Sequence, residues 1–262
     1  MAEQTAGIAL VRRPTDDLAE GIVTHVERVP VDAALAAEQH AGYRAALAAA
    51  GWEVREVESA PGCPDAVFVE DSVVVVDGTA VLTRSGAERR RAEVHGTEAT
   101  VRELGLDVVR ITGDGTLDGG DVLQVGTTVY VGRGGRTNAE GIRQLRAHLA
   151  PLGRTVVPVG LQAVLHLKSA VTALPDGTFL ALPELLEPGV FPVARPVTEE
   201  AGCHVVPLGG DQVLISSAAP RTIDRLADLG FSPLVVDIGE FEKLEGCVTC
   251  LSVLVRPPAP AA

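Results

Sequence analysis

The chain has 262 residues, a length that suits one large domain or two small ones. It carries 22 Lys and Arg against 35 Asp and Glu, and the net charge of −13 repels phosphate backbones and anionic membrane surfaces, so neither nucleic acid nor membrane is expected as a partner. Hydrophobic residues make up 46% of the chain, which excludes a wholly disordered protein.

Two further features bear on the compartment. No stretch approaches the ~20 consecutive apolar residues that cross a bilayer, and the first residues lack the long apolar core of a secretion signal. The four cysteines are too few for a disulfide scaffold. We therefore expect a cytoplasmic protein whose cysteines are buried, metal-binding or nucleophilic.

The first expected elements are a strand at Ile8–Val11 and an Ala-rich helix over Asp32–Ala50 that ends at Gly51. After these, the chain repeats a strand, a Gly-containing turn and a second strand, which is typical of β-hairpins. The expected strands are Val67–Val76 with Thr79–Thr83, Val122–Val125 with Thr128–Val131, Val164–Leu174 with Thr178–Leu182, Val213–Ser217, and Val248–Val255, which can pair with Ile8–Val11.

Helices are predicted between these strand pairs. Two capping boxes and two glycine stops mark their ends: Ser85 with Glu88, Thr137 with Glu140, Gly105 and Gly153. Each repeat therefore combines strands with a helix. The Pro-rich stretch Pro183–Pro196 is interpreted as a connection and not as a domain boundary, because the repeat continues beyond it.

The repeat has a measurable spacing. Comparable residues follow one another at intervals of 50, 47, 43 and 39 positions: Asp71, Asp121, Lys168, Asp211 and Cys250. A period of about 40 to 50 residues indicates a closed radial array. With helices outside and strand ends inside, the polar residues at those ends would converge on a central channel, where we expect the chemistry.

Cys247 and Cys250 form a Cys-x-x-Cys motif that could be a redox pair or half of a zinc site. Both interpretations lack a second pair of Cys or His ligands at suitable spacing. Cys250 begins an apolar run that would face the channel. It is therefore the better candidate for a nucleophile.

His166 is a polar residue in the apolar sequence Val164 to Leu167. The simplest interpretation is a hydrogen-bonded core histidine. In a radial array, however, the segments that carry His166 and Cys250 can both reach the centre. A thiol and an imidazole within reach of one another are what covalent catalysis requires.

Acidic residues recur at comparable places in the first two full repeats: Asp65, Glu70, Asp71, Asp118 and Asp121. Acids beside glycine often do no more than form turns. A cluster of carboxylates near one thiol would raise the pKa of that thiol and disable it, unless a cation arrives with the substrate. The clustering therefore indicates a positively charged substrate.

Six sequence strings occur in order between about residues 8 and 255: Asp65-Ala-Val-Phe-Val-Glu-Asp71, Thr83-Arg-Ser-Gly-Ala87 with Arg90, Leu117-Asp-Gly-Gly-Asp-Val122, Arg136-Thr-Asn138, Leu165-His-Leu-Lys-Ser169 and Thr249-Cys-Leu-Ser252. In this order they resemble the dimethylarginine dimethylaminohydrolase family of the guanidino-modifying pentein superfamily. The resemblance implies an α/β fold, a five-bladed α/β propeller of strand-strand-helix modules with a central active-site channel. We expect one such domain over residues 1–256 and a disordered tail at 257–262.

The resemblance also implies an activity. Enzymes of this family hydrolyse Nω,Nω-dimethylarginine and Nω-monomethylarginine to citrulline and dimethylamine or methylamine, through a covalent S-alkylthiouronium on cysteine. The expected partner is thus a small methylated arginine, bound by a monomer or homodimer. No cofactor and no metal are expected.

Site residues follow from the matching positions. Cys250 would be the nucleophile, His166 the general acid and base, and Asp118 the third catalytic residue. The remaining positions would bind substrate: Asp65 and Asp71 the guanidinium, Arg90 and Arg136 the α-carboxylate, Leu18 on a flap over the site, Leu244 near the α-amino group, and Glu70 a part of the substrate that is not specified.

Two positions depart from the family pattern. Cys247 stands where an apolar residue is expected, and Ser85 where proline is frequent. Three alternatives stay open at this point: an arginine deiminase that releases ammonia, a non-catalytic propeller such as a ribosome-binding factor, and a thiol redox or zinc protein built on Cys247 and Cys250. The net charge of −13 disfavours a partner rich in RNA.

Overall fold

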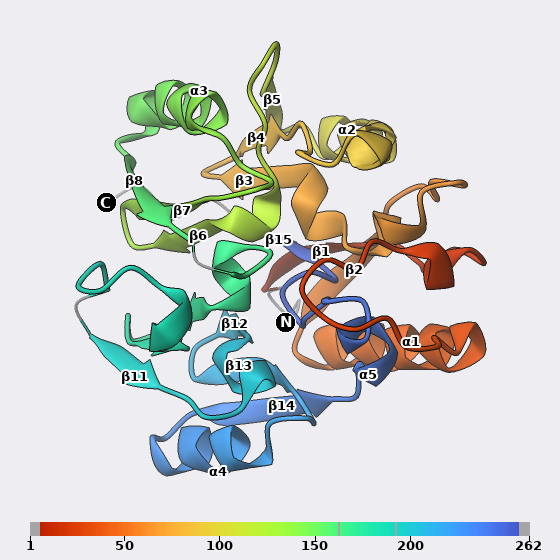
Figure 1. Cartoon of the computed structure of the whole chain (residues 1–262), viewed down its shortest axis with the longest axis vertical. Helices are drawn as coiled ribbons and strands as arrows, with labels where there is room; N and C mark the ends of the chain where they lie inside the picture. Colours follow the sequence, from red (N-terminus) through yellow and green to blue (C-terminus); the bar gives the residue numbers. More distant parts are fainter. Residues whose placement is uncertain (1–5, 162, 192, 257–262) are drawn as a thin grey trace, which may run out of the picture.

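Within residues 6–161, 163–191 and 193–256, which the computed structural model describes, fifteen strands form five separate sheets of three (Figure 1). In spatial order the sheets are β15 (Val253–Val255), β1 (Gly7–Val11) and β2 (Trp52–Glu56); β3 (Val73–Val76), β4 (Thr79–Leu82) and β5 (Asp107–Arg110); β6 (Val122–Val125), β7 (Thr128–Arg133) and β8 (Thr155–Gly160); β9 (Val171–Ala173), β10 (Phe179–Ala181) and β11 (Ala194–Pro196); β12 (Val205–Gly209), β13 (Gln212–Ser216) and β14 (Ser232–Val236).

All five sheets share one topology. The middle strand pairs antiparallel with the inner strand and parallel with the outer one, as β4 does with β3 and β5. Each sheet is called a blade here and is named by its inner strand. The inner strands β3, β6, β9, β12 and β15 surround a central cavity of about 360 Å³. The fold is the five-bladed α/β propeller that the repeat spacing and the resemblance predict.

The ring closes by pairing the two ends of the described chain. β15 joins β1 in the antiparallel register Ile8 with Val255 and Leu10 with Val253, which confirms the expected pairing of these segments. β1 then pairs in parallel with β2. The β15 blade therefore cannot form until the two ends of the described chain meet.

The core lies between neighbouring blades. Five buried apolar clusters each join the side chains of two adjacent blades; for example, Val74 and Val81 of the β3 blade pack with Val122 and Val131 of the β6 blade. These faces are rich in valine, whose branched side chain fits a pleated surface. Packing between blades fixes the position of each inner strand around the axis.

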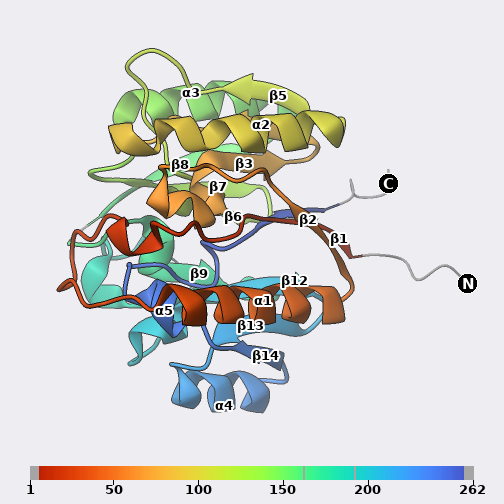
Figure 2. The same cartoon turned by 90° about the vertical axis from the view of Figure 1, so that its right-hand side faces the viewer.

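Four helices lie on the outside of the ring, as Figures 1 and 2 show: α1 (Ala33–Ala49), α2 (Val94–Glu103), α3 (Ala139–Leu149) and α4 (Pro220–Asp228). A short fifth helix is α5 (Gly239–Glu242). The predicted helix at Asp32–Ala50 is confirmed as α1. It begins after Asp32, because the Asp32 side chain accepts hydrogen bonds from the backbone N–H groups of Ala34 and Leu35. Among the described residues, no helix combines the length and the apolar character needed to cross a bilayer.

Two details of the helix predictions are wrong. Ser85 does not cap an α-helix, since a 3₁₀ helix over Glu88–Glu93 precedes α2. Asn138, and not Thr137, caps α3 by accepting from the N–H of Gly141. In the β9 blade, the Pro-rich stretch supplies a 3₁₀ turn at Pro183–Leu185 and then β11, in place of an outer α-helix.

Three predicted strands begin too early. Residues 67–72, 164–170 and 248–252 are turns, and the inner strands start only at Val73, Val171 and Val253. These turns hold the residues singled out by the sequence, including His166, which is not embedded in a strand. The expected tail at 257–262 lies outside the described residues, and the single domain over 1–256 stays a prediction.

Candidate active site

A tight turn precedes the inner strand of each blade, and four of these turns carry the polar groups of the site. Asp71 lies in the 3₁₀ turn Val69–Ser72 before β3, and Asp118 directly precedes the turn Gly119–Asp121 before β6. His166 directly precedes the turn Leu167–Ser169 before β9. Cys250 ends a turn before β15, where its N–H donates to the carbonyl of Cys247 at 3.0 Å. The common position of the turns brings these groups to the propeller axis.

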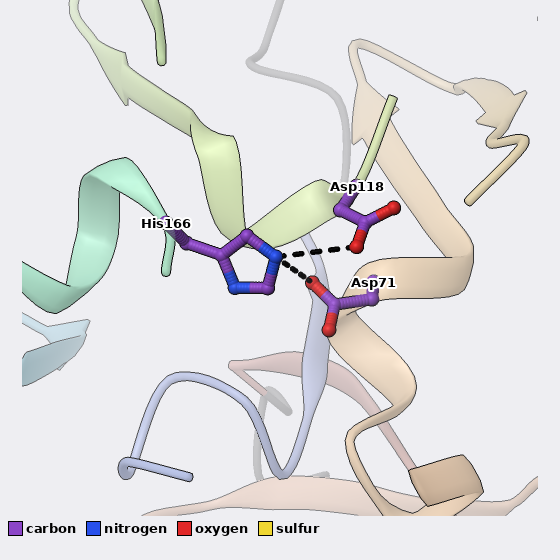
Figure 3. A group of neighbouring side chains, drawn as sticks. All are labelled: Asp71, Asp118 and His166. Atoms are coloured by element: carbon purple, nitrogen blue, oxygen red, sulfur yellow. Dashed lines mark hydrogen bonds and ion pairs between the residues drawn. The ribbon is translucent and has the colours of Figure 1, made fainter. Parts of the chain in front are cut away.

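Three of the predicted residues meet directly (Figure 3). His166 Nε2 donates to Asp118 Oδ2 at 3.2 Å and lies 3.9 Å from Asp71 Oδ1. All three side chains are buried. Burial alone would lower the pKa of His166, but the charge of Asp71, the hydrogen bond to Asp118 and the charge of Asp121 together raise it to about 9. The imidazole is therefore a buried cation at neutral pH.

Two glycines allow this close approach. A Cβ atom on Gly120 would lie 2.6 Å from His166 Nδ1 and 2.9 Å from Asp71 Oδ1. A Cβ atom on Gly119 would lie 1.9 Å from the carbonyl oxygen of Glu70. The Gly-Gly pair between the two aspartates is thus required by packing against the neighbouring blades and not only by the turn.

Asp71 is held from three sides. Its Oδ1 accepts from the N–H of Gly120 at 2.8 Å, and its Oδ2 accepts from Arg90 Nη1 at 2.7 Å. Burial would raise the pKa of Asp71, but the nearby charges of His166 and Arg90 outweigh it and hold the pKa well below its usual range. Asp71 therefore remains a carboxylate.

Asp118 is fully buried and has three partners. Besides His166, Oδ2 accepts from Arg136 Nη1 at 3.2 Å, and Oδ1 accepts from the N–H of Gly86 at 3.1 Å. Arg136 thus joins the cluster as predicted, with its guanidinium directed at a site carboxylate. Whether it also binds a substrate carboxylate stays a prediction.

Arg90 also joins the cluster, but every contact it makes is to the protein. It forms a two-point pair with Glu93 at 2.9 Å and donates to Asp71, and its Nη2 also reaches the carbonyls of Asp65 and Phe68. Its side chain is only 4% exposed. A substrate carboxylate at Arg90 would replace one of these contacts, and that role stays a prediction.

Glu70 faces away from the imidazole and pairs with Lys168, two positions after His166. Burial raises the pKa of Glu70 to about 8, and Lys168 opposes that shift. Both side chains border the inner end of the central cavity. Glu70 is thus already paired with an ammonium group of the protein, and the substrate contact expected for it stays a prediction.

Cys250 lies next to the Glu70–Asp71 segment. Its carbonyl accepts from the N–H of Glu70 at 3.2 Å, and its Sγ lies 3.3 Å from Cys247 Sγ. The Cys247 hydrogen bond, burial and the charges of Glu70 and Asp71 raise the pKa of Cys250 well above its ordinary value. Cys250 thus contacts Glu70, and His166 lies beside the neighbouring Asp71, with the thiol held protonated.

The predicted flap residues gather over Asp65. Asp65 Oδ1 accepts from the N–H of Ile22 at 2.9 Å, and the neighbouring Gly21 packs within reach of both Asp65 and Leu244. Leu18, in the 3₁₀ turn Leu18–Glu20, is fully buried, and Leu244 is 2% exposed. Asp65 and Leu244 thus pack against the loop between β1 and α1, and this loop carries Leu18.

Three supporting residues were not identified as site residues from the sequence. Asp121 accepts from Thr137 Oγ1 at 2.5 Å and from the N–H of Leu167 at 2.9 Å, so it fixes the turn that carries His166. Thr137 also accepts from the N–H of Asp118 at 3.1 Å. Glu93 binds Arg90. The spacing of Arg90 and Glu93 by three positions could have indicated that pair.

The Asp71, Asp118 and His166 ligand atoms lie within 4.8 Å of one another, close enough to bind one metal ion. Arg90 and Arg136, however, already donate to the same two carboxylates. Two guanidinium groups at this distance repel a further cation. The cluster is therefore better suited to an organic cation that can replace these donors than to a metal ion, and the expected absence of a metal stays a prediction.

Comparison with known proteins places the chain among guanidino-modifying enzymes. The arginine deiminase family profile matches residues 31–211. An N(G),N(G)-dimethylarginine dimethylaminohydrolase of Streptomyces coelicolor is 60% identical over 249 residues, which cover 95% of this chain and 96% of the relative. That match extends through all five blades.

Solved structures agree with this result. The dimethylarginine dimethylaminohydrolase of Pseudomonas aeruginosa, solved as a cysteine-to-serine mutant complexed with citrulline, superposes with a TM-score of 0.89 at 32% identity, covering 96% of this chain and 100% of the other. A histidine-to-glycine variant of a dimethylarginine dimethylaminohydrolase, solved as an adduct with S-methyl-L-thiocitrulline, gives 0.90 at the same identity and coverage. The chain belongs to the arginine deiminase family of the pentein superfamily and, within it, to the dimethylarginine dimethylaminohydrolases.

Proposed function

We propose that this protein hydrolyses the guanidino group of methylated arginines, converting Nω,Nω-dimethylarginine to citrulline and dimethylamine and Nω-monomethylarginine to citrulline and methylamine. The observation that carries the proposal is the buried cluster in which Asp71 and Asp118 hold the cationic imidazole of His166. Two carboxylates that hold one buried cation are suited to a guanidinium, whose planar N–H groups bind carboxylates in pairs. The 60% identity to the Streptomyces coelicolor enzyme supports this substrate class.

The charge of the substrate also activates the nucleophile. Glu70 and Asp71 disfavour ionisation of the Cys250 thiol in the free protein. A guanidinium bound against Asp71 and next to the sulfur offsets this negative charge and favours the thiolate. The reactive form is thereby generated next to the carbon that it attacks.

The first half of the reaction ends in a covalent intermediate. The Cys250 thiolate donates an electron pair to the guanidinium carbon and forms a C–S bond, and His166 transfers its proton to the methylated nitrogen. The C–N bond then breaks and dimethylamine leaves as a neutral amine, which gives an S-alkylthiouronium on Cys250. The adduct of a related histidine-to-glycine variant with S-methyl-L-thiocitrulline supports such an intermediate.

The second half uses the same imidazole. Neutral His166 accepts a proton from water while the water oxygen attacks the same carbon. The C–S bond breaks, the proton that remains on the added hydroxyl passes to the departing sulfur so that Cys250 returns as a thiol, and the carbon becomes the ureido group of citrulline. The citrulline complex of the Pseudomonas aeruginosa relative supports this product. In this scheme Asp118 orients His166 through its 3.2 Å hydrogen bond.

Arginine deimination is the second candidate, because the matching family profile is that of arginine deiminase. The steps are the same except that ammonia replaces the methylated amine. The two activities differ only in the group that must fit around the leaving nitrogen. A cytoplasmic location, the absence of a cofactor, and a monomeric or homodimeric state stay predictions.

The test compares three substrates under identical conditions. We expect citrulline and dimethylamine from dimethylarginine, citrulline and methylamine from monomethylarginine, and a kcat/KM for arginine at least about tenfold lower, which corresponds to about 1.4 kcal/mol. The Cys250→Ser variant, assayed as a control for contaminating enzymes, should lose roughly 10³-fold or more. Preference for arginine would establish the deiminase instead, and no citrulline from any of the three would overturn both candidates.

A further inference from the structure

The Cys-x-x-Cys motif forms a closed turn beside the site. Cys250 N–H donates to the Cys247 carbonyl at 3.0 Å, so the two residues occupy the first and last positions of a hydrogen-bonded turn. Their Sγ atoms lie 3.3 Å apart, and both side chains are buried, at 3% and 8% exposure. Cys247 has no part in the proposed hydrolysis.

This geometry suits a disulfide. The first and last Cα atoms of such a turn lie within about 7 Å, which includes the Cα separation of most disulfides. The two sulfurs already point at each other, so bond formation needs a small rotation of each side chain and no movement of a strand. The blade that follows the turn can therefore stay in place when the bond forms.

The surroundings make the two sulfurs different. Cys247 accepts from the Cys250 thiol and from Thr249 Oγ1 at 3.2 Å, and the side chain of His204 contributes a positive charge. The Cys250 hydrogen bond lowers the pKa of Cys247 well below its ordinary value, burial opposes this, and His204 adds to it. Cys250 faces Glu70 and Asp71, which disfavour its ionisation. Cys247 is therefore the thiolate of the pair, and a thiolate is the form that reacts with oxidants.

We propose that Cys247 and Cys250 form a reversible disulfide that switches off the enzyme by occupying its nucleophile, an inference that rests on the proposed function of Cys250. The oxidant is a small peroxide. The Cys247 thiolate attacks one peroxide oxygen, forms sulfenic acid and releases hydroxide. The Cys250 sulfur then attacks the sulfenic sulfur, the S–S bond forms, and the sulfenic oxygen leaves as water with the Cys250 proton. A dithiol reductant restores both thiols and is itself oxidised.

The experiment treats the reduced full chain with hydrogen peroxide, stops the reaction with catalase, and measures thiols, mass and turnover of dimethylarginine. We expect the free thiols in denatured protein to fall from the four of the sequence to two. The tryptic peptide that begins at Leu244 carries both cysteines and should become about 2 Da lighter, because a disulfide loses two hydrogens. Turnover should fall at least tenfold and return with dithiothreitol.

Two variants identify the partner thiol. Cys247→Val keeps an apolar side chain of similar size, should turn over within about threefold of wild type when reduced, and should lose activity in peroxide at least tenfold more slowly, because Cys250 ionises poorly. Cys63→Ala removes a buried cysteine outside the pair and should respond like wild type. A Cys247→Val variant that is inactivated as fast as wild type would overturn the proposal.

The failure of this proposal is distinguishable from failure of the proposed function. Two results would overturn the disulfide even if the reduced protein forms citrulline. In the first, the tryptic peptide that begins at Leu244 keeps its reduced mass after peroxide. In the second, that peptide gains oxygen on Cys250 while Cys247 stays a free thiol. If the peptide becomes about 2 Da lighter but the reduced protein never produces citrulline, the disulfide is supported and its link to hydrolysis is overturned.

Discussion

The turns before β9 and β12 make an instructive comparison, because each places a buried histidine next to the start of an inner strand. His166, before β9, faces the carboxylates of Asp118 and Asp71. His204, before β12, directs Nε2 at the carbonyl of Ser169 at 3.1 Å and follows Cys203, whose thiol donates to the carbonyls of Glu200 and Ser169. His166 precedes the turn of its blade and His204 follows the turn of its own blade, and of the two imidazoles only that of His166 pairs with carboxylates of the described residues.

The pKa values of the two histidines are raised for different reasons. Burial lowers both, but for His166 the opposing charges come from Asp71, Asp121 and Asp118, whereas for His204 they come from Cys203 and Cys247. A carboxylate cluster attracts a cationic substrate. The cysteines near His204 do not attract a cationic substrate in this way, so we expect His204 to be dispensable for hydrolysis.

The largest expected effect separates these two histidines. His166→Ala should lower kcat for dimethylarginine by about 10²–10⁴-fold, because the leaving amine loses its proton donor. With a substrate whose leaving group departs without protonation, such as an S-methyl thiourea analogue, this variant should form an adduct on Cys250 and not hydrolyse it. Trapping is checked by intact-protein mass spectrometry.

The matched control is His204→Ala, which removes a buried imidazole from the β12 turn and should keep kcat within about threefold. Equal losses in the two variants would show that the imidazoles act through folding alone. Circular dichroism of both variants identifies a folding defect.

A smaller effect is expected from substitution of Gly120, the glycine that allows the turn before β6 to contact His166. In Gly120→Ala, the added Cβ would lie 2.6 Å from His166 Nδ1, so the imidazole must move. We expect about 1–3 kcal/mol less stability in urea unfolding and a kcat/KM at least about tenfold lower. Gly42→Ala is the control, since its Cβ meets nothing within 4 Å in the middle of α1 and should gain up to about 1 kcal/mol. Unchanged kinetics in Gly120→Ala would contradict the tight fit.

The final expected effect, which concerns stability and not turnover, is a slope of stability with pH. The folded pKa of His166, about 9, lies above its ordinary value of 6.5, so its stabilising charge is fully present below pH 6.5 and is lost as pH rises to 9. This amounts to about 3 kcal/mol. Glu70, with a folded pKa of about 8, changes stability in the same direction over pH 4.5 to 8. Urea unfolding from pH 6 to 9 should show a fall that becomes smaller in His166→Ala, whereas an equal fall in both proteins would remove His166 as its source.

Much of the fold could be predicted from local patterns. The Asp-Gly turn at Asp77 and the cap at Asp32 are explicit in the sequence, and the hairpin of β6 and β7 has the predicted position. The beginnings of β3, β9 and β15 could not be predicted, since residues such as Val69 and Leu167 are as apolar as a strand but lie in 3₁₀ turns packed against other blades. Tertiary contacts decide these conformations.

The candidate site, like the fold, could be predicted only in part. The recurrence of acids at comparable places in the first two full repeats indicated Asp71 and Asp118, which the structure brings to His166. The pairs of Glu70 with Lys168 and of Asp121 with Thr137 join different repeats or different turns, so sequence spacing alone does not reveal them. The contacts of Cys247 with Cys250 follow from a turn that the sequence placed in a strand.

The pairing of β15 with β1, which closes the propeller ring, has a consequence for the rate of folding. Pairing of Ile8 with Val255 joins segments separated by nearly the whole described chain, and contacts of such high sequence separation form late and slowly. The Cys250 sulfur reaches its position in the site only when β15 has paired with β1. During refolding, enzymatic turnover should therefore recover later than helical circular dichroism, and an incompletely closed ring would hold the three turns that carry Asp71, Asp118 and His166 without the nucleophile.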